Sequence, residues 1–474
     1  MRFRALALVL AASILAVPAA LAHEPPSPNL AGAGASCEQS PAGAPDDASF
    51  NGRFCRNVAE MARLRGDLCR EVEDDDPCGY LDGRSITEKS VQEYEASWVH
   101  RAMDAQRALD DNVPLAEALW PHTHNSYNSS WYPMRIANSD PNQRYSMSQQ
   151  LRMDMRILEL DVHWHAGQVV LCHGEPVSAG VTTVHAGCSA DRTLAEGLAE
   201  IRGWLGTNPN EVIGIYLENA LDDEPAAYEA AVAALSSELG PLVYRPRNGE
   251  CDALPATTVT RKDIRDSGAR VFLVGNRDEE KGPWCEWVHE RDQTSTWWES
   301  GSDFGSDFPA YPECVGYLAD PKRAGSRPWT RVYEDATWLS QMAGGGGEVT
   351  ALEVERMVTC GVTMPGFDNL DPHDEGRLGA LVWSWAPGEP ATSGCAYQGT
   401  DARLHTDDCK QPRRVACLTA GGDWIVAKKR ASWDRASSTC GRAGATFAAP
   451  WNGRENRRLA DAAAGDAVWV AHRA

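Results

Sequence analysis

Short apolar runs alternate with amphipathic stretches between residues 113 and 392. Runs of this length are typical of buried parallel strands, which read as nearly continuous apolar segments. Between two of them, leucine and isoleucine recur at helical spacing from Leu194 to Leu205, after a capping-box start at Thr193 and Glu196. The runs are Arg156–His163, Val169–Cys172, Glu211–Leu217, Arg270–Gly275, Val362–Phe367 and Leu378–Trp385.

This strand–helix repetition predicts an α/β protein whose main domain, residues 113–392, is a TIM-type (β/α) barrel. Eight clean strands cannot be counted, so a doubly wound sheet remains the alternative. Residues 23–112 read as a linker followed by a helical extension that contains cysteines, and residues 393–474 as a small C-terminal domain.

The first 22 residues have the features of a secretory signal peptide. Arg2 and Arg4 precede an apolar run, and Ala20-Leu21-Ala22 fits a cleavage site. A buried N-terminal helix is the alternative, but the Pro/Gly/Ala-rich stretch 25–45 cannot continue one. No other segment reaches the roughly 18 apolar residues of a membrane span. We therefore expect a secreted or extracytoplasmic protein.

Fourteen cysteines fit an oxidising compartment and predict disulfides. Cys172 and Cys188 flank one short loop and are the pair we predict first. No C-x-x-C spacing is present, which argues against structural zinc. The tryptophan-rich segment 276–349 could contact a membrane, but we expect its tryptophans to be buried against the barrel.

The net charge of −22 repels nucleic acid and argues against a nucleic-acid partner. If the substrate is an anionic lipid, a bound cation must supply local positive charge.

Half of the twelve histidines lie between residues 122 and 185. His124 and His173 each directly follow an apolar run, where barrel strands deliver side chains to the active face. We predict that these two are catalytic. His163, His165 and His185 are interpreted as ordinary polar residues.

Glu159 and Asp161 are two residues apart in an apolar run, so a strand places them on one face. Glu218 ends another run, and Asn125 follows His124. Oxygen ligands of this kind favour calcium or magnesium over zinc. The sequence predicts a metal site of Asn125, Glu159, Asp161 and Glu218, with strand-end salt bridges as the alternative.

In order, the segments His124–Tyr127, Leu158–Val162, His173-Gly174 and Tyr216–Asn219 resemble the catalytic region of calcium-dependent phosphoinositide-specific phospholipase C, including secreted bacterial members. The match covers about residues 115–220, and Val382–Ala386 resembles a late strand of the bacterial members. The metal-independent bacterial branch lacks this carboxylate set and fits less well.

The resemblance implies that Asn125, Glu159, Asp161 and Glu218 bind Ca²⁺, which contacts the phosphate and the inositol 2-hydroxyl. It implies that His124 stabilises charge on the phosphoryl group or takes the hydroxyl proton, with Glu159 as the other candidate base, and that His173 protonates the leaving oxygen. The expected substrate is a phospholipid at a membrane surface, which the enzyme reaches as a peripheral protein.

One departure concerns head-group choice. Signalling phospholipases have lysines for the 4- and 5-phosphates where this chain has Phe272–Asn276, so unphosphorylated phosphatidylinositol is the expected substrate. Residues 393–474 partly resemble a C-type-lectin-like fold, through Trp433–Ala436, Phe447–Pro450 and Val468–Val470. This C-terminal domain is expected to be α+β, and carbohydrate or surface binding by it is a hypothesis.

Three other functions remain open. A zinc amidohydrolase could use His122-x-His124 as a ligand pair. Glycerophosphodiesterase or sphingomyelinase-D-like chemistry shares the use of two histidines and an acidic metal site. A non-catalytic surface-binding protein is the third alternative.

Overall fold

The computed structural model describes 80–81, 84–85, 88–132, 141–173, 175–179, 182–186, 188, 192–221, 224–246, 252–275, 282–291, 297–301, 308–314, 329–337, 347–391 and 393–473. The predicted signal peptide, the linker and the first four cysteines lie outside these residues. Two short strands, β1 (Tyr80–Leu81) and β2 (Arg84–Ser85), precede the main body.

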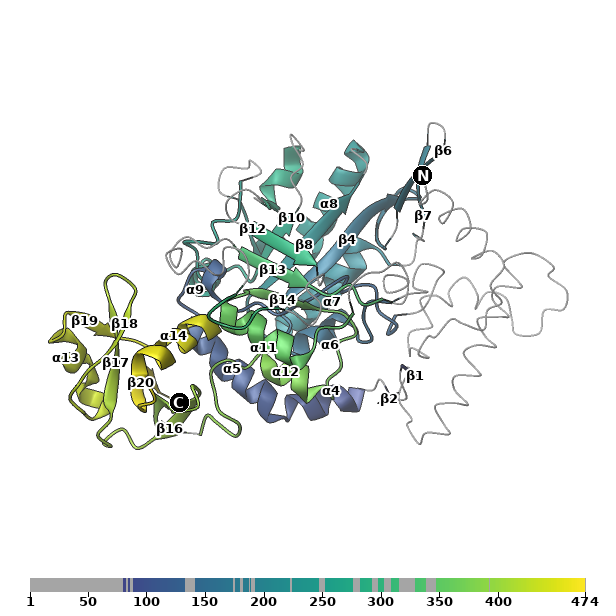
Figure 1. Cartoon of the computed structure of the whole chain (residues 1–474). Coiled ribbons are helices and arrows are strands. Elements are labelled where there is room, and N and C mark those ends of the chain that lie inside the picture. The colour runs from purple at the N-terminus through teal and green to yellow at the C-terminus, as the bar shows by residue number, and fades with distance from the viewer. Residues whose placement is uncertain are drawn as a thin grey trace.

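A curled, mainly parallel sheet forms the centre of the protein, with the strand order β11-β10-β8-β4-β3-β14-β13-β12 (Figure 1). The strands are β3 (His122–Thr123), β4 (Ile157–His165), β8 (Ile213–Ala220), β10 (Val271–Gly275), β11 (His289–Glu290), β12 (Trp297–Gly301), β13 (Trp329–Tyr333) and β14 (Met364–Phe367). The short strand β9 (Val243–Tyr244) pairs with β10.

The strand order distinguishes the two predicted architectures. From β3 the chain adds β4, β8, β10 and β11 successively on one side, and it returns through β12, β13 and β14 to the other side of β3. This is the cyclic order of a singly wound barrel, whereas a doubly wound sheet reverses direction at a switch point. Among the described residues β11 and β12 do not pair, so the curled sheet is open there.

Two predicted barrel strands are corrected by the structure. The run Val169–Cys172 forms β5 (Gln168–Leu171), which pairs antiparallel with β4 as a hairpin. The run Leu378–Trp385 begins inside helix α12 (Glu375–Ala380) and continues as irregular chain. The second prediction was wrong because periodicity alone cannot separate a short apolar strand from a buried helical turn. The side chain of Asp374 caps this helix by accepting from the backbone amide of Arg377.

Helices cover the outside of the sheet. They are α4 (Glu88–Glu95), α5 (Trp98–Asp110), α6 (Met147–Arg152), α7 (Leu194–Thr207), α8 (Pro225–Glu238), α9 (Arg261–Asp266) and α11 (Ala351–Cys360), besides α12. The predicted capping box at Thr193 and Glu196 is confirmed at the start of α7. Leu198 and Ile201 of α7 pack in one core with Leu158 and Ile215 of the sheet.

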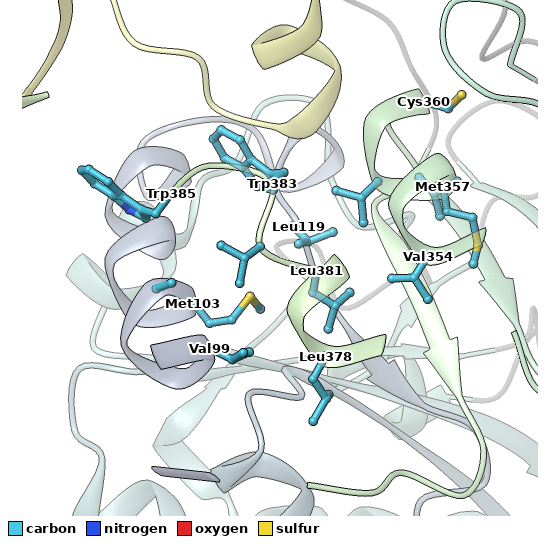
Figure 2. Close-up of a cluster of buried hydrophobic side chains, with 14 of the residues drawn as sticks. Val99, Met103, Leu119, Val354, Met357, Cys360, Leu378, Leu381, Trp383 and Trp385 are labelled. Atoms are coloured by element: carbon cyan, nitrogen blue, oxygen red, sulfur yellow. The ribbon is translucent and has the colours of Figure 1, made fainter. Parts of the chain in front are cut away.

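A second apolar core lies between α5, α11 and α12. Val99 of α5, Met357 of α11 and Leu378 of α12 belong to one buried cluster (Figure 2). Leu459 and Val468, from the C-terminal part of the chain, belong to the same cluster. Helix α14 (Gly453–Ala463) packs against α11, so residues 393–473 are joined to the main body by a shared core (Figure 1).

The C-terminal part is itself a sheet with two short helices. Its strands are β15 (Cys395–Gln398), β16 (Leu404–Asp407), β17 (Arg414–Thr419), β18 (Trp424–Val426), β19 (Ala445–Phe447) and β20 (Val468–Arg473). Its helices are α13 (Ala436–Gly441) and α14. Disulfides join Cys395 to Cys409 and Cys417 to Cys440. This is an α+β unit, and its likeness to C-type lectins stays a prediction.

The predicted disulfide between Cys172 and Cys188 is confirmed, and a further one joins Cys314 to Cys360. Strands β6 (Glu175–Ala179) and β7 (Thr182–Ala186) form the hairpin between Cys172 and Cys188. Burial of the tryptophans is confirmed for Trp284, Trp287 and Trp329. Within the described part of the chain, every helix is too short or too polar to cross a lipid bilayer.

A buried carboxylate joins α5 to the loop before β4. Asp154 is fully buried and accepts from the Tyr94 hydroxyl at 2.8 Å and from Arg107 at 2.8 Å, and it lies 2.9 Å from Nδ1 of His100. Burial raises the pKa of Asp154, but Arg107 and His100 outweigh burial and hold that pKa well below its usual value. Asp154 therefore contributes stability as a carboxylate.

We expect Asp154→Asn to lower the free energy of unfolding at pH 7 by at most about 3–5 kcal/mol, because it removes the buried carboxylate that Arg107 and His100 both contact, while Asp104 and Glu211 still face Arg107. Since folding lowers the pKa of Asp154, this stabilisation is present above the unfolded value of about 4 and is lost as the pH falls through the folded value. Urea unfolding of both proteins between pH 7 and pH 2 should show the difference shrinking below pH 4. Asp104→Asn, at a side chain 70% exposed, is the control. Equal stability of the wild type and Asp154→Asn at pH 7 would contradict the assignment.

Candidate active site

The carboxyl ends of β3, β4 and β8 bring the predicted acidic residues together. Glu159 and Asp161 lie on β4, and Asp161 is directly opposite Glu218 of β8. One carboxylate oxygen from each of Glu159, Asp161 and Glu218 lies within 4.8 Å of the others. The three side chains that were predicted to share a metal thus form one cluster at the mouth of the sheet.

Electrostatic repulsion is the main physical feature of this cluster. Glu159 and Asp161 are 1% and 4% exposed, and Glu218 is exposed. Burial, followed by the carboxylates of Glu218 and Glu159, raises the pKa of Asp161 well above its usual value. The Tyr127 hydroxyl donates to Asp161 at 2.8 Å, which offsets only part of this charge. Clustered carboxylate oxygens are suited to a hard cation such as Ca²⁺.

Asn125 is fixed beside the cluster by its backbone. Its φ of 45° lies in the left-handed region, which asparagine tolerates better than most residues. The backbone amide of Asn125 donates to Oε2 of Glu159 at 3.3 Å, and the backbone amide of Glu159 donates to the Ser126 hydroxyl at 2.9 Å. Asn125 is 2% exposed, so this turn holds a buried neutral amide next to the acidic residues.

A protein cation, Arg331 of β13, already borders the cluster. Its Nη2 donates to Oε2 of Glu159 at 2.5 Å, and its Nε donates to Nε2 of His122 at 3.1 Å. The guanidinium lies over the rings of Tyr216 and Tyr333, at 4.7 and 4.3 Å from their centroids. Arg331 and the backbone amide of Asn125 both donate to Oε2 of Glu159.

His122 does not have the environment of a zinc ligand. Burial and the adjacent Arg331 hold the pKa of His122 well below its usual value. Its Nε2 accepts from Arg331, and a guanidinium in that position competes with a metal for the same lone pair. This contact disfavours the zinc amidohydrolase interpretation.

His124 follows β3 and faces a carboxylate that sequence reasoning did not single out. Its Nδ1 lies 3.2 Å from Oδ1 of Asp368, which is fully buried at the end of β14. The ring packs on Tyr333 at a centroid distance of 4.9 Å. Burial lowers the pKa of His124, but the carboxylates of Asp368 and Glu159 outweigh burial and raise it to about 9.

The contact with Asp368 orients His124. A carboxylate at Nδ1 fixes the tautomer of a histidine and leaves Nε2 for chemistry on a substrate. Asp335, just after β13, also places a carboxylate oxygen within 4.8 Å of the His124–Asp368 pair. Asp368 directly follows the run Val362–Phe367, so the strand-end rule that selected His124 could have selected it. Arg331 lies in a weakly periodic segment, where no sequence signal selects it.

His173 lies at the end of the β4–β5 hairpin. The amide of Cys172 donates to the carbonyl of Asp161 at 3.4 Å, so the hairpin returns the chain to the level of the acidic cluster. His173 is the next residue, and its side chain is exposed. His173, the second predicted catalytic histidine, therefore directly follows the point where the hairpin meets β4 at Asp161. His163, which we interpreted as non-catalytic, is buried on β4.

Distant solved structures include known phospholipases C. The phosphatidylinositol-specific phospholipase C from Listeria monocytogenes is 15% identical, with a TM-score of 0.40, over 59% of this chain and 98% of that chain. PLC21 of L. pealei is 12% identical, with a TM-score of 0.35, over 68% of this chain and 46% of that chain. Both TM-scores are below 0.5, so the family assignment rests on sequence.

Two sequence comparisons agree. The model of the Rv2075c PI-PLC-like domain matches residues 83–374. The uncharacterized proteins Rv2075c and MT2135, from Mycobacterium tuberculosis strains H37Rv and CDC 1551, are each 36% identical over 501 aligned residues, covering 98% of this chain and 96% of each relative. The chain therefore belongs to the Rv2075c PI-PLC-like family of phosphodiesterase-type domains.

Proposed function

We propose that this protein is a secreted, calcium-dependent phospholipase C that cleaves phosphatidylinositol to diacylglycerol and a cyclic inositol phosphate. The observation that carries the proposal is the convergence of Glu159, Asp161 and Glu218 within 4.8 Å, beside His124 at the mouth of the sheet. Membership of a PI-PLC-like family supports phosphodiester chemistry. The identity of the lipid, the requirement for Ca²⁺ and secretion go beyond family membership and are part of the proposal.

The residues divide the reaction between them. Asn125, Glu159, Asp161 and Glu218 would hold Ca²⁺. When bound, the ion would neutralise phosphoryl charge and lower the pKa of the inositol 2-hydroxyl. The 2-hydroxyl oxygen forms a bond to phosphorus while the bond from phosphorus to the diacylglycerol oxygen breaks.

Two protons must move in this step. The 2-hydroxyl proton passes to His124 or Glu159, and His173 gives a proton to the leaving diacylglycerol oxygen. The orientation of His124 by Asp368 supports a direct role for its ring at the phosphoryl group, either as a base or as a hydrogen-bond donor. Water later opens the 1,2-cyclic phosphate.

Unphosphorylated phosphatidylinositol is the proposed head group. The strand that replaces the lysine-bearing segment of signalling phospholipases, β10, is apolar and buried from Val271 to Val274. It provides no cation for the 4- and 5-phosphates. The enzyme would reach the lipid as a peripheral protein at a membrane surface.

Turnover of purified protein on phosphatidylinositol vesicles tests this function. We expect cyclic inositol phosphate and diacylglycerol with Ca²⁺, and loss of both products when the metal is chelated. Release of choline from sphingomyelin, or of glycerol phosphate from glycerophosphodiesters, would favour the alternative phosphodiesterases. Binding to vesicles without turnover of any of these substrates would favour a non-catalytic surface protein.

His124→Ala and His173→Ala should each lower kcat on phosphatidylinositol by about 10²–10⁴-fold, which is the range for one positioned proton-transfer group. His165→Ala, at the last residue of β4, is the matched control and should keep wild-type kcat. Retention of kcat in His173→Ala would remove the proposed acid.

Glu218→Gln should weaken Ca²⁺ binding by roughly tenfold or more, measured by isothermal titration calorimetry, because it removes one charged ligand. It should also raise the melting temperature of the calcium-free protein, since it relieves repulsion with Asp161. Saturating Ca²⁺ should stabilise the wild type more than the variant. An unchanged affinity would exclude Glu218 from the metal site.

A further inference from the structure

The carboxylate that orients His124 is itself held from several sides. Asp368 accepts from the amide of Ala336 at 2.8 Å through Oδ2, and from Asn142 at 3.1 Å through Oδ1. Its own amide donates to Oε2 of Glu334 at 2.6 Å. The contact with Glu334 leads away from the substrate side into the protein.

Glu334 directly follows β13 and is fully buried. Its Oε2 accepts from the backbone amide of Asp368. Its Oε1 accepts from the backbone amide of Val349 at 2.6 Å and from Nη2 of Arg377 at 2.6 Å. Burial raises the pKa of Glu334 to about 8, against the lowering effect of Arg377. All three partners are donors, however, so the geometry requires the side chain to accept through both oxygens, as a carboxylate does. Glu334 therefore joins the ends of β13 and β14 to the segment before α11.

Arg377 of α12 completes the arrangement. Its side chain is 10% exposed, its Nη2 also lies 3.4 Å from the carbonyl of Asp368, and its guanidinium lies 5.3 Å from the ring centroid of Phe367. The next residue, Leu378, is in the apolar cluster with Leu381 (Figure 2). Packing of α12 thus fixes where the arginine can reach.

We propose that Glu334 and Arg377 are positioning residues: a buried ion pair that holds the backbone and carboxylate of Asp368 against His124. The inference rests on the proposed phosphodiesterase function and deepens it. Among the residues that the structure describes, both contact the backbone of Asp368 and neither contacts the acidic cluster, so both act through Asp368. A displacement of about 1 Å in a catalytic constellation can lower the rate by roughly 10²-fold.

The competing explanation is that Glu334 and Arg377 only stabilise the fold. A second buried ion pair, away from His124, serves as the control for this explanation. Asp110 and Arg261 form a buried ion pair, with side chains 1% and 4% exposed. Asp110 also accepts a backbone amide, that of Leu119, at 3.1 Å. This pair lies before β3, at the end of the strands opposite the catalytic mouth, where it contacts the backbone of Leu119.

The test compares Glu334→Gln and Arg377→Met with Asp110→Asn, at a temperature where every variant is folded. The proposal predicts that Glu334→Gln and Arg377→Met lower kcat on phosphatidylinositol by about 10–100-fold, with KM changed less than twofold. Asp110→Asn should lower the melting temperature and keep kcat. Arg377→Lys, which retains the charge, should recover part of the rate. Equal kcat in Glu334→Gln and Asp110→Asn would overturn the proposal, as would a rise in KM alone.

Chemical rescue gives a second measurement. Arg377 lines a polar cavity of about 530 Å³ together with Arg144, Asp371 and Asp374. The space left by Arg377→Ala would adjoin this cavity, so added guanidinium ion should restore part of kcat in that variant and none in His124→Ala. No restoration at any concentration that keeps the protein folded would count against a charge-specific role.

Crystal structures of Glu334→Gln and Asp110→Asn separate this inference from the proposed function. Positioning predicts that the 3.2 Å contact between His124 and Asp368 lengthens in Glu334→Gln and is kept in Asp110→Asn. An unchanged contact in Glu334→Gln contradicts the proposal. Absence of phosphodiester turnover in the wild type would reject the proposed function, while the two structures would still decide whether Glu334 positions Asp368.

Discussion

The repulsion among Glu159, Asp161 and Glu218 is the constraint on which the rest of the site depends. Parallel strands end at the same edge of a sheet, so β4 and β8 place these carboxylates side by side whatever their charge. Two of them are buried, where water cannot screen the repulsion. Such a cluster is a favourable site for a divalent cation. The acidity of the whole chain makes this local need for positive charge greater.

Arg331 shows how the fold stabilises part of the cluster without a metal. Its guanidinium donates hydrogen bonds to Oε2 of Glu159 and to His122, and it lies over the rings of two tyrosines, Tyr216 and Tyr333. Glu159 is thereby held in place by a cation, and Asp161 accepts from the neutral Tyr127 hydroxyl. The site thus combines a fixed protein cation with a group of oxygens that remain electrostatically unbalanced. Family membership agrees with phosphoryl chemistry at such a site and does not identify the lipid.

Local rules predicted much of this site from sequence. The i, i+2 spacing placed Glu159 and Asp161 on one face, and the strand-end rule selected His124 and Glu218. Contacts that depend on pairing between strands far apart in the chain could not be predicted, because nothing in the spacing says that β14 lies beside β3. Asp368 meets His124 through that pairing, 244 residues away in the chain. The error at α12 has another cause, since a short apolar run is compatible with either a strand or a helical turn.

Residues of α11, α12 and the C-terminal sheet share one buried apolar core with Phe367, the residue before Asp368. The C-terminal part of the chain is thereby packed against the end of β14.

The central claim is that one divalent ion resides among the side chains of Asn125, Glu159, Asp161 and Glu218. A crystal structure determined with millimolar Ca²⁺ tests it most directly. The account predicts a single ion with oxygen ligands from these residues at 2.3–2.6 Å. Clear density for all four side chains with no ion between them would contradict it.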